Sequence, residues 1–218
     1  MKSNLCKLLT LTGVLLLSAA CQQPATVNTS EDAAIGTLGT NSTANMNVQM
    51  RSRTKGSMME SSPDAANAPL DLQFLDTMSA QHQTAIDMAK TVVAKSDNAQ
   101  LKAFAEKIIR DQNEEITRMK NWRGIWFAES LPAINMEIPG MMDSIRSLNM
   151  KKLEAGGELF NLRFLEMMIP HHQGAVTMSR EALGKAKHAE IKSLASQIIK
   201  SHEVEIKKMQ EWKTILSK

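Results

Sequence analysis

Residues 164–179 read FLEMMIPHHQGAVTMS, and residues 74–90 carry a degenerate copy of this stretch, FLDTMSAQHQTAIDMAK. Shifting the chain by 90 residues aligns 72–122 with 162–212 without a gap, and 18 of the 51 aligned positions are identical. Chance agreement between unrelated segments would be much lower. The sequence therefore predicts an internal duplication, in which each copy forms one unit that packs against the other.

Each copy has the pattern of a helical hairpin. Apolar residues recur at intervals of three and four, which is the spacing of a helix with one buried face. Asp97, with Gln100 three residues later, has the form of a capping box, and Gly184 suits the end of a helix. The predicted helices cover residues 71–95, 97–126, a segment ending near Gly184, and 188–217. Two amphipathic hairpins must bury their apolar faces against each other, so the expected fold is an all-α, four-helix bundle.

The chain divides by composition into a leader, a polar segment and the helical region. Residues 22–69 are rich in Ala, Thr, Ser, Asn and Gln and show no sustained apolar period, so they cannot bury enough surface to fold. We assign 1–20 to a signal peptide, 22–69 to a disordered tether that contains methionine, and 70–218 to the bundle. Within the bundle we expect repeat one at 70–126, a connection with a short helix near 141–153 at 127–157, and repeat two at 158–218.

The N-terminal leader indicates export. Lys2 and Lys7 flank the start of an apolar run, residues 8–17, which is too short to span a bilayer but suits a signal peptide. The run leads into LLLSAAC, which resembles a lipobox, so we expect cleavage before Cys21 and lipidation of Cys21. Ordinary cleavage after a small residue is the alternative. The expected product is a lipoprotein of the bacterial cell envelope that faces the periplasm and contacts the membrane through its lipid.

Charge and composition exclude some classes of partner. The chain has 26 basic and 23 acidic residues, a net charge of +3 and no dense basic segment, so nucleic acid is not an expected partner. Methionine is unusually frequent, at 16 residues. Cleavage before Cys21 also removes Cys6, which leaves one cysteine and no internal disulfide. An exported protein that needs soft metal ligands without thiols would use methionine and histidine.

Methionine and histidine gather on one face of the predicted helices. At about 100° per residue, Met168 and His172 lie on one face, and His171 and Met178 lie on its adjoining edge. The candidate metal ligands are Met167, Met168, His171, His172 and Met178 in the second copy, Met78, His82 and Met88 in the first, and His202 on the last helix. Gln81 stands where the second copy has His171, so the second copy is the richer candidate. Thioether and imidazole ligands favour Cu(I) or Ag(I) over hard cations.

Each candidate also has a purely structural interpretation. Helical methionines commonly fill gaps in a core, and an inward histidine is commonly just hydrogen-bonded. We expect plain packing for Met119 and Met209. We expect Glu115 and Glu205 to be solvated or to cap neighbouring hydrogen bonds. Pro170 lacks a backbone N–H, which predicts a kink, an opened carbonyl or a new helix start at this position.

The same stretches resemble a known family. The strings FLEMMIPHHQGAVTMS, HAEIKSLASQIIKSHEVEIKKM and the degenerate copy FLDTMSAQHQTAIDMAK resemble the CopM-like domain-of-unknown-function family, over residues 70–218. The resemblance implies an exported bacterial protein with a ferritin-like four-helix bundle, and some members of the family bind copper through Met and His and aid copper resistance. By the same resemblance the implicated ligands are Met168, His171, His172 and Met178, with Met78, His82 and Met88 in the first copy.

The expected function is to sequester Cu(I) in the cell envelope or to hand it on, with silver as a second ion and a copper-handling protein as a further partner. A di-iron carboxylate oxidase is less favoured, because the chain contains no Glu-x-x-His sequence. A metal-free structural or docking bundle is the other alternative. No nucleophile–base pair or phosphate-binding glycine loop stands out, so we do not expect an enzyme.

Overall fold

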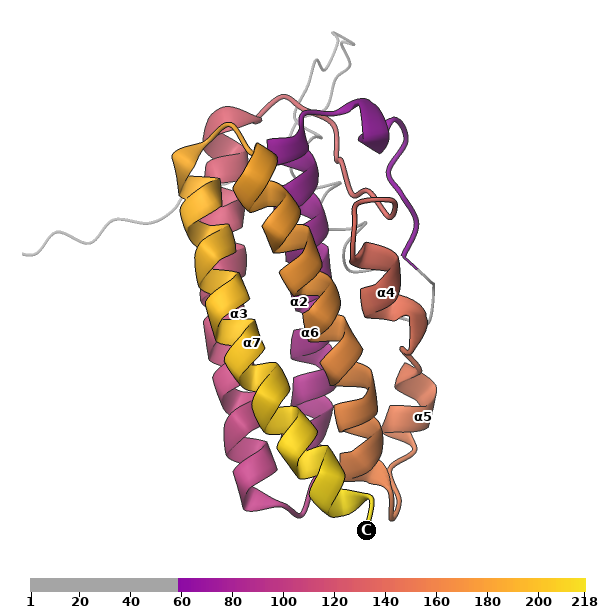
Figure 1. Ribbon diagram of the computed structural model, residues 1–218. Helices are drawn as coiled ribbons and strands as arrows, with labels where there is room; N and C mark the ends of the chain where they lie inside the picture. Colours follow the sequence, from indigo (N-terminus) through magenta and orange to yellow (C-terminus); the bar gives the residue numbers. More distant parts are fainter. Residues whose placement is uncertain (1–58) are drawn as a thin grey trace, which may run out of the picture. The chain divides into compact units, whose positions relative to one another are not determined.

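Four long helices, arranged as two antiparallel hairpins, make up most of residues 59–218, the part of the chain that the computed structural model describes (Figure 1). The first hairpin joins α2 (Leu70–Lys95) to α3 (Ala99–Trp126), and the second joins α6 (Phe160–Lys185) to α7 (Ala189–Leu216). α2 packs against α3 and α6, and α6 packs against α7. Residues 59–218 contain no strand, so the predicted all-α, four-helix bundle is confirmed.

Two helix ends differ from the prediction. Asn98, and not Asp97, caps α3: its side-chain oxygen accepts the backbone N–H three residues further on, at 2.9 Å. Both residue types are good caps, but the Asp97 carboxylate is occupied by a side-chain amide of the second hairpin. Gly184 lies inside α6, which ends only where Ala186 turns to an extended conformation, with φ −59° and ψ 147°.

The start of α7 is capped by a residue from another helix. Asp71, in the first turn of α2, accepts the backbone N–H groups of Lys187 and His188 at 2.9 Å, and it also bonds the His188 imidazole. His188 in turn stacks on Trp126, with ring centroids 3.8 Å apart. A carboxylate at a helix N-terminus satisfies unpaired N–H groups and opposes the positive end of the helix dipole. Asp71 therefore ties the second hairpin to the first.

The connection between the hairpins packs along α6. It contains α4 (Met141–Arg146) and α5 (Met150–Glu154), so two short helices replace the single one expected near 141–153. Gly140 and Gly174 allow a close approach of α4 to α6, because a Cβ at Gly174 would stand 2.3 Å from the carbonyl oxygen of Gly140. Gly140 also has a φ of 91°, a left-handed conformation that favours glycine.

The packed part of the chain begins before Leu70. A short 3-10 helix, η1 (Ala65–Asn67), precedes α2. Ser62 pairs with the connection: its N–H donates to the Ile134 carbonyl at 2.8 Å, and its hydroxyl accepts the Ile134 N–H at 3.1 Å. The predicted signal peptide, the predicted lipidation site Cys21 and the tether up to residue 58 lie outside the described residues. No helix within residues 59–218 is long and apolar enough to cross a membrane.

The core consists of two apolar clusters, one toward each end of the bundle. Phe74 and Ile198 belong to one cluster, and their duplicates, Phe164 and Ile108, belong to the other. α2 and α6 also run in opposite directions (Figure 1). The two hairpins are therefore related by an approximate two-fold rotation across the bundle axis, and the duplicated halves face each other at the centre of the bundle.

Candidate metal centre

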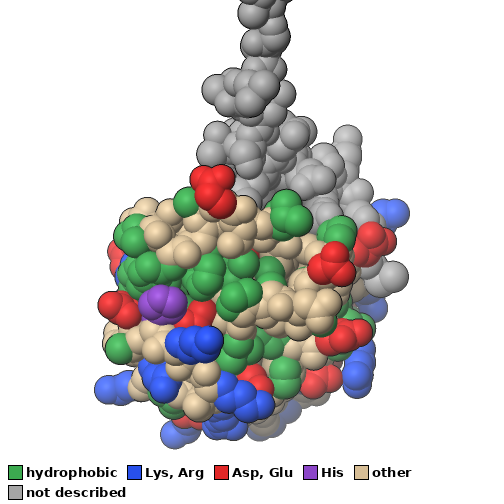
Figure 2. All heavy atoms as spheres, turned by 90° about the horizontal axis from the view of Figure 1, so that it is seen from above, with side chains coloured by type: hydrophobic (Ala, Val, Ile, Leu, Met, Phe, Trp, Pro, Cys, Tyr) green, Lys and Arg blue, Asp and Glu red, His purple; other side chains and the backbone are tan. Residues whose placement is uncertain are grey.

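A layer of buried polar side chains separates the two apolar clusters, at the middle of the four long helices. Its members are Gln81 and His82 on α2, Gln112 and Glu115 on α3, His171 and His172 on α6, and His202 and Glu205 on α7. All eight residues are at most 7% exposed. Four of the five histidines of the chain thus lie in this layer. Figure 2, which looks onto one end of the bundle, shows a single patch of histidine surface.

Each hairpin supplies one histidine–glutamate pair to the layer. In the first hairpin, Nε2 of His82 lies 2.7 Å from Oε2 of Glu115. In the second hairpin, Nε2 of His172 lies 3.1 Å from Oε2 of Glu205. Both pairs span 33 residues, so the duplication has preserved the interaction as well as the residues.

The remaining positions of the layer differ between the hairpins. Gln81 and Gln112 of the first hairpin correspond to His171 and His202 of the second. The second hairpin therefore supplies three imidazoles where the first supplies one. These rings meet in the centre of the bundle: His202 stacks on His172 with centroids 4.3 Å apart, and on His82 with centroids 5.6 Å apart.

The Gln81 amide links the two halves of the layer and fixes where two protons lie. Its nitrogen donates to the backbone carbonyl of His171 at 2.9 Å, and a carbonyl only accepts, so this contact sets the orientation of the amide. The same nitrogen lies 2.9 Å from Nδ1 of His171, which must then accept, and the His171 proton sits on Nε2. The amide oxygen lies 2.9 Å from Nδ1 of His82, which must then donate.

Several polar atoms of the layer have no hydrogen-bond partner within residues 59–218. These atoms are Nε2 of His171, Nδ1 of His172, Nε2 of His202 and both amide atoms of Gln112. Buried polar atoms are nearly always paired, because an unpaired one costs about 1–3 kcal/mol. Three unpaired imidazole nitrogens in one buried layer therefore point to a further ligand.

Glu205 prepares His172 to bind a metal ion. The carboxylate accepts the proton of Nε2, which leaves the lone pair of Nδ1 free. Burial raises the pKa of Glu205, but the hydrogen bond from His172 and the contact with Lys107 outweigh burial and lower the pKa, so the carboxylate is ionised. Ligand atoms of His172, His202 and Glu205 all lie within 4.8 Å of one another.

Burial also sets the charge state of the His171 and His202 imidazoles. Burial lowers the pKa of His171 well below its ordinary value, and the neighbouring imidazoles of His172 and His82 lower it further. Burial and the same two imidazoles likewise lower the pKa of His202 well below its ordinary value. Both rings are therefore neutral near pH 7, and neutral imidazole is the form that binds metal ions.

The candidate methionines do not join the histidines in one place. Met78 and Met178 belong to one apolar cluster, whereas Met88, Met167 and Met168 belong to the other. Met168 and Met178 are ten residues apart on α6, which separates them by about 15 Å along the helix axis. Two sulfurs bound to one ion lie within about 5 Å of each other, because a metal–sulfur bond measures about 2.3 Å. The two thioethers therefore flank the histidine layer on opposite sides and cannot share one ion.

The two glutamates of the layer differ from the prediction. Glu115 and Glu205 were expected to be solvated or to cap hydrogen bonds, and this was wrong: both are buried and each bonds a histidine. Their retention in both copies, at one fixed spacing from a histidine, is the signal that would have identified them.

α6 continues through Pro170, so no new helix starts there, and the carbonyl four residues before the proline lacks its usual donor.

A comparison with protein families assigns the chain to one of them. The model of the family described as "Domain of unknown function (DUF305)" matches residues 16–123 and 128–213. The chain belongs to the DUF305 family. Each matched segment covers most of one hairpin, in agreement with the internal duplication. None of the curated proteins matches the chain significantly.

Solved structures of related proteins share the helical fold. CopM in its Cu(I)-bound form is 34% identical, with a TM-score of 0.56, and the match covers 65% of this chain and 94% of the CopM chain. CopM in a silver-bound form is 35% identical, with a TM-score of 0.55, over 65% of this chain and 93% of CopM. A DUF305 protein from Streptomyces coelicolor, described as a candidate secreted protein, is 27% identical with a TM-score of 0.59, over 68% of this chain and 93% of its own. CopM has also been solved with Cu(II) bound. The resemblance to a CopM-like DUF305 family is thus confirmed.

Proposed function

We propose that this DUF305 protein binds Cu(I) in the central histidine layer and either sequesters the ion or hands it on within the cell envelope. One observation carries the proposal: Nδ1 of His172 and Nε2 of His202 are buried and unpaired, and they belong to rings that stack 4.3 Å apart. The copper- and silver-bound forms of CopM support the choice of ion. Silver resembles Cu(I) in charge and softness, so it takes the same ligands.

His172 and His202 are the principal ligands in this proposal. Glu205 does not bind the ion but fixes the ring of His172, as carboxylates commonly do behind metal-binding histidines. His171 becomes a third ligand only when its proton moves from Nε2, which requires the Gln81 amide to turn. His82 has hydrogen bonds at both ring nitrogens, so it serves as a secondary ligand at most.

The flanking methionines supply weaker ligands on both sides of the layer. Met168 lies one turn before His172 on the same face of α6, so its thioether is the sulfur best placed to join the principal ligands. Met178, Met78, Met88 and Met167 lie in the apolar clusters and provide soft sulfur along the bundle. Thioethers bind Cu(I) without being ionised, so they leave the clusters uncharged.

The layer suits copper better than the centre of a di-iron oxidase. A di-iron centre of this fold uses four glutamates with two histidines. Within residues 59–218 the layer holds two glutamates, and each is bonded to a histidine. The ratio of imidazole to carboxylate is thus the reverse of what di-iron chemistry requires, and it favours a softer ion.

The proposal extends to the place of action. We propose that the mature chain begins at a lipidated Cys21, that it faces the periplasm, and that a copper-handling protein receives or supplies the ion. The candidate secreted DUF305 protein from Streptomyces coelicolor supports export. An anchored bundle with a tether would hold a buried copper ion near the membrane. The protein would thereby contribute to copper tolerance or homeostasis.

X-ray absorption at the copper edge of the Cu(I)-loaded protein tests the ligand set. The proposal predicts imidazole nitrogen as the main ligand, with at most one sulfur atom at about 2.3 Å, a typical metal–sulfur bond length. A shell of two or more sulfurs without imidazole would move the site into an apolar cluster. Failure to bind Cu(I) at all would favour the metal-free structural bundle.

A further inference from the structure

We infer that Lys107 of α3 is a specificity-determining residue: it neutralises Glu205 so that the histidine layer takes a monovalent soft cation in preference to a divalent one. The inference rests on the proposed function and adds the reason for the preference. It concerns a residue that binds no metal itself, because an ammonium group has only donors to offer.

Lys107 occupies the oxygen of Glu205 that the histidine leaves free. Its ammonium nitrogen lies 2.8 Å from Oε1 of Glu205, while Oε2 of the same carboxylate accepts from His172 at 3.1 Å. Both oxygens of Glu205 are therefore in use. The ammonium also donates to Asp111 at 2.6 Å, and this second contact holds the lysine in place.

The lysine bridges solvent and the buried layer. Lys107 and Glu205 meet in a groove of about 470 Å³ between α3 and α7, which is also lined by Lys200, Lys208 and apolar side chains. The side chain of Lys107 is 48% exposed, whereas that of Glu205 is 7% exposed. The ammonium group thus stands at the boundary between the groove and the imidazoles, where an arriving cation would meet it.

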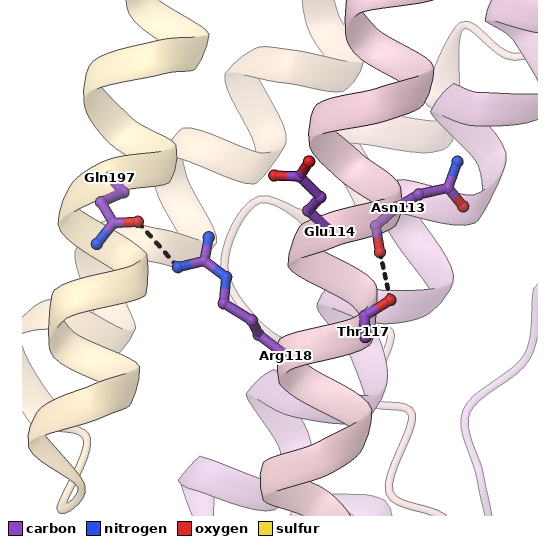
Figure 3. A pocket seen from close by; sticks show the side chains of 5 residues that line it. All are labelled: Asn113, Glu114, Thr117, Arg118 and Gln197. Carbon is purple, nitrogen blue, oxygen red and sulfur yellow. Dashed lines mark hydrogen bonds between the residues drawn. The ribbon is translucent and has the colours of Figure 1, made fainter. Parts of the chain in front are cut away.

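The duplicated half of the molecule lacks this contact. Gln197 of α7 is the duplicate of Lys107, and its amide oxygen accepts from Arg118 of α3 at 3.0 Å. Figure 3 shows these two side chains pointing toward each other across the space between α3 and α7. Within residues 59–218, no lysine or arginine pairs with Glu115, the duplicate of Glu205. Within residues 59–218, a lysine therefore neutralises the glutamate of the hairpin with three imidazoles, Glu205, but not its duplicate, Glu115.

Charge explains why this contact selects among ions. A carboxylate is a hard ligand that favours divalent cations, but each oxygen of Glu205 already accepts a hydrogen bond, one from Lys107 and one from His172. Lys107 also neutralises the one buried carboxylate of this group, because Glu205 is 7% exposed whereas the second partner of the lysine, Asp111, is 45% exposed and screened by solvent. Little negative charge therefore remains inside the layer to offset the cost of burying an ion. That cost rises steeply with ionic charge, and the ammonium repels a divalent ion twice as strongly as a monovalent one.

The test measures Cu(I) and Zn(II) affinities side by side under anaerobic conditions, because Zn(II) is a divalent ion without redox chemistry. Lys107→Gln copies the residue that the chain itself has at the duplicated position. We expect it to bind Zn(II) more tightly and to lower the ratio of Cu(I) to Zn(II) affinity about tenfold or more. Lys107→Arg keeps the charge and should keep the ratio of the wild type. Lys107→Met replaces the glutamine variant should the latter fail to fold.

Lys200→Gln is the matched control, because it removes one positive charge from the same groove without touching Glu205. An unchanged ratio in Lys107→Gln, or an equal fall in Lys200→Gln, would overturn the inference. Two other results would overturn the proposed function itself: no Cu(I) binding by the wild-type protein, or the same Cu(I) affinity in His202→Ala as in the wild type.

Discussion

Gln81 and His171 occupy duplicated positions, 90 residues apart, and they bond to each other: the amide nitrogen of Gln81 lies 2.9 Å from both Nδ1 and the backbone oxygen of His171. One half of the duplication thus holds the other at the centre of the bundle. An imidazole that accepts a hydrogen bond at one nitrogen carries its proton on the other. The amide therefore keeps His171 from acting as a ligand through Nε2, although its pKa leaves the ring neutral.

His171 should consequently matter less than its neighbour for copper binding. We expect His171→Ala to lower Cu(I) affinity by less than about tenfold in the wild type. Gln81→Leu frees Nδ1 of His171, so the ring can present a lone pair, and we expect this variant to bind Cu(I) about tenfold more tightly. Adding His171→Ala to Gln81→Leu should abolish the gain. Chelator competition on the four proteins measures the coupling, and strictly additive effects would show that the amide does not control His171.

The Glu205 carboxylate orients a ligand, so its loss should weaken copper binding without removing a ligand. We expect Glu205→Gln to lower Cu(I) affinity by about 10–100-fold, because the amide holds the His172 tautomer less firmly. Glu115→Gln makes the same change in the duplicated pair and should lower affinity much less. Equal losses in the two variants would indicate that both pairs support one site, or that neither pair orients a ligand.

The two flanking methionines should respond differently to replacement by leucine. Leucine keeps most of the volume, so Met168→Leu and Met178→Leu should each change the free energy of unfolding without metal by less than about 1.5 kcal/mol. Met168 is one turn from His172 and its loss should weaken Cu(I) binding about tenfold, whereas Met178 is too far along α6 to contribute to the same ion. Met119→Leu serves as a packing control, since Met119 is fully buried outside the layer. A larger effect at Met178 than at Met168 would place the ion on the other side of the layer.

Asp71 should make the free energy of unfolding of the bundle depend on pH in the acidic range. Burial raises the pKa of Asp71, but the N–H groups of Lys187 and His188 and the His188 imidazole outweigh burial, so the pKa is lowered from its ordinary value of 3.8. The carboxylate therefore stabilises the fold above about pH 4, and this stabilisation is lost as the pH falls through the lowered pKa. Asp71→Asn should reduce the free energy of unfolding by about 1–3 kcal/mol at pH 7 and by progressively less below pH 4.

Denaturant unfolding at a series of pH values measures this effect. Asp143→Asn is the control, because Asp143 is exposed and, among residues 59–218, its one ion-pair partner is Arg146 on its own helix. A deficit in Asp71→Asn that stays constant from pH 7 to pH 3 would show that the cap acts through shape and not through charge.

The sequence predicted the helices well because the same apolar spacing occurs twice, so each hairpin supports the other. Local signals were weaker at the helix ends. Asp97 and Asn98 are adjacent and equally good caps, and only the tertiary contact of Asp97 with the second hairpin separates them. The cap that Asp71 provides to α7 lies 116 residues away in sequence, so no local pattern reveals it. The segment before Leu70 looked too polar to pack, yet Ser62 finds partners in the connection.

Two features of the histidine layer were not predicted from the sequence, and they have a common cause. A helical wheel gives the angle of a residue around the axis but not its height, so it grouped Met168 with Met178 although they lie about 15 Å apart along α6. Glu115 and Glu205 were missed because a glutamate that looks solvated in one helix becomes buried once the partner helix brings a histidine. Aligning the two copies residue by residue shows the histidine–glutamate pairs directly.

Anaerobic titration with Cu(I) against a competing chelator, on the wild type, His202→Ala and His188→Ala, tests whether copper binds in the histidine layer. His202 is buried in the layer with an unpaired Nε2, whereas His188 lies outside the layer, bonded to Asp71. If His202 is a principal ligand, the wild type has a tight site, His202→Ala loses about 100-fold in Cu(I) affinity, and His188→Ala changes little. The same Cu(I) affinity in all three proteins would show that copper does not bind in the histidine layer.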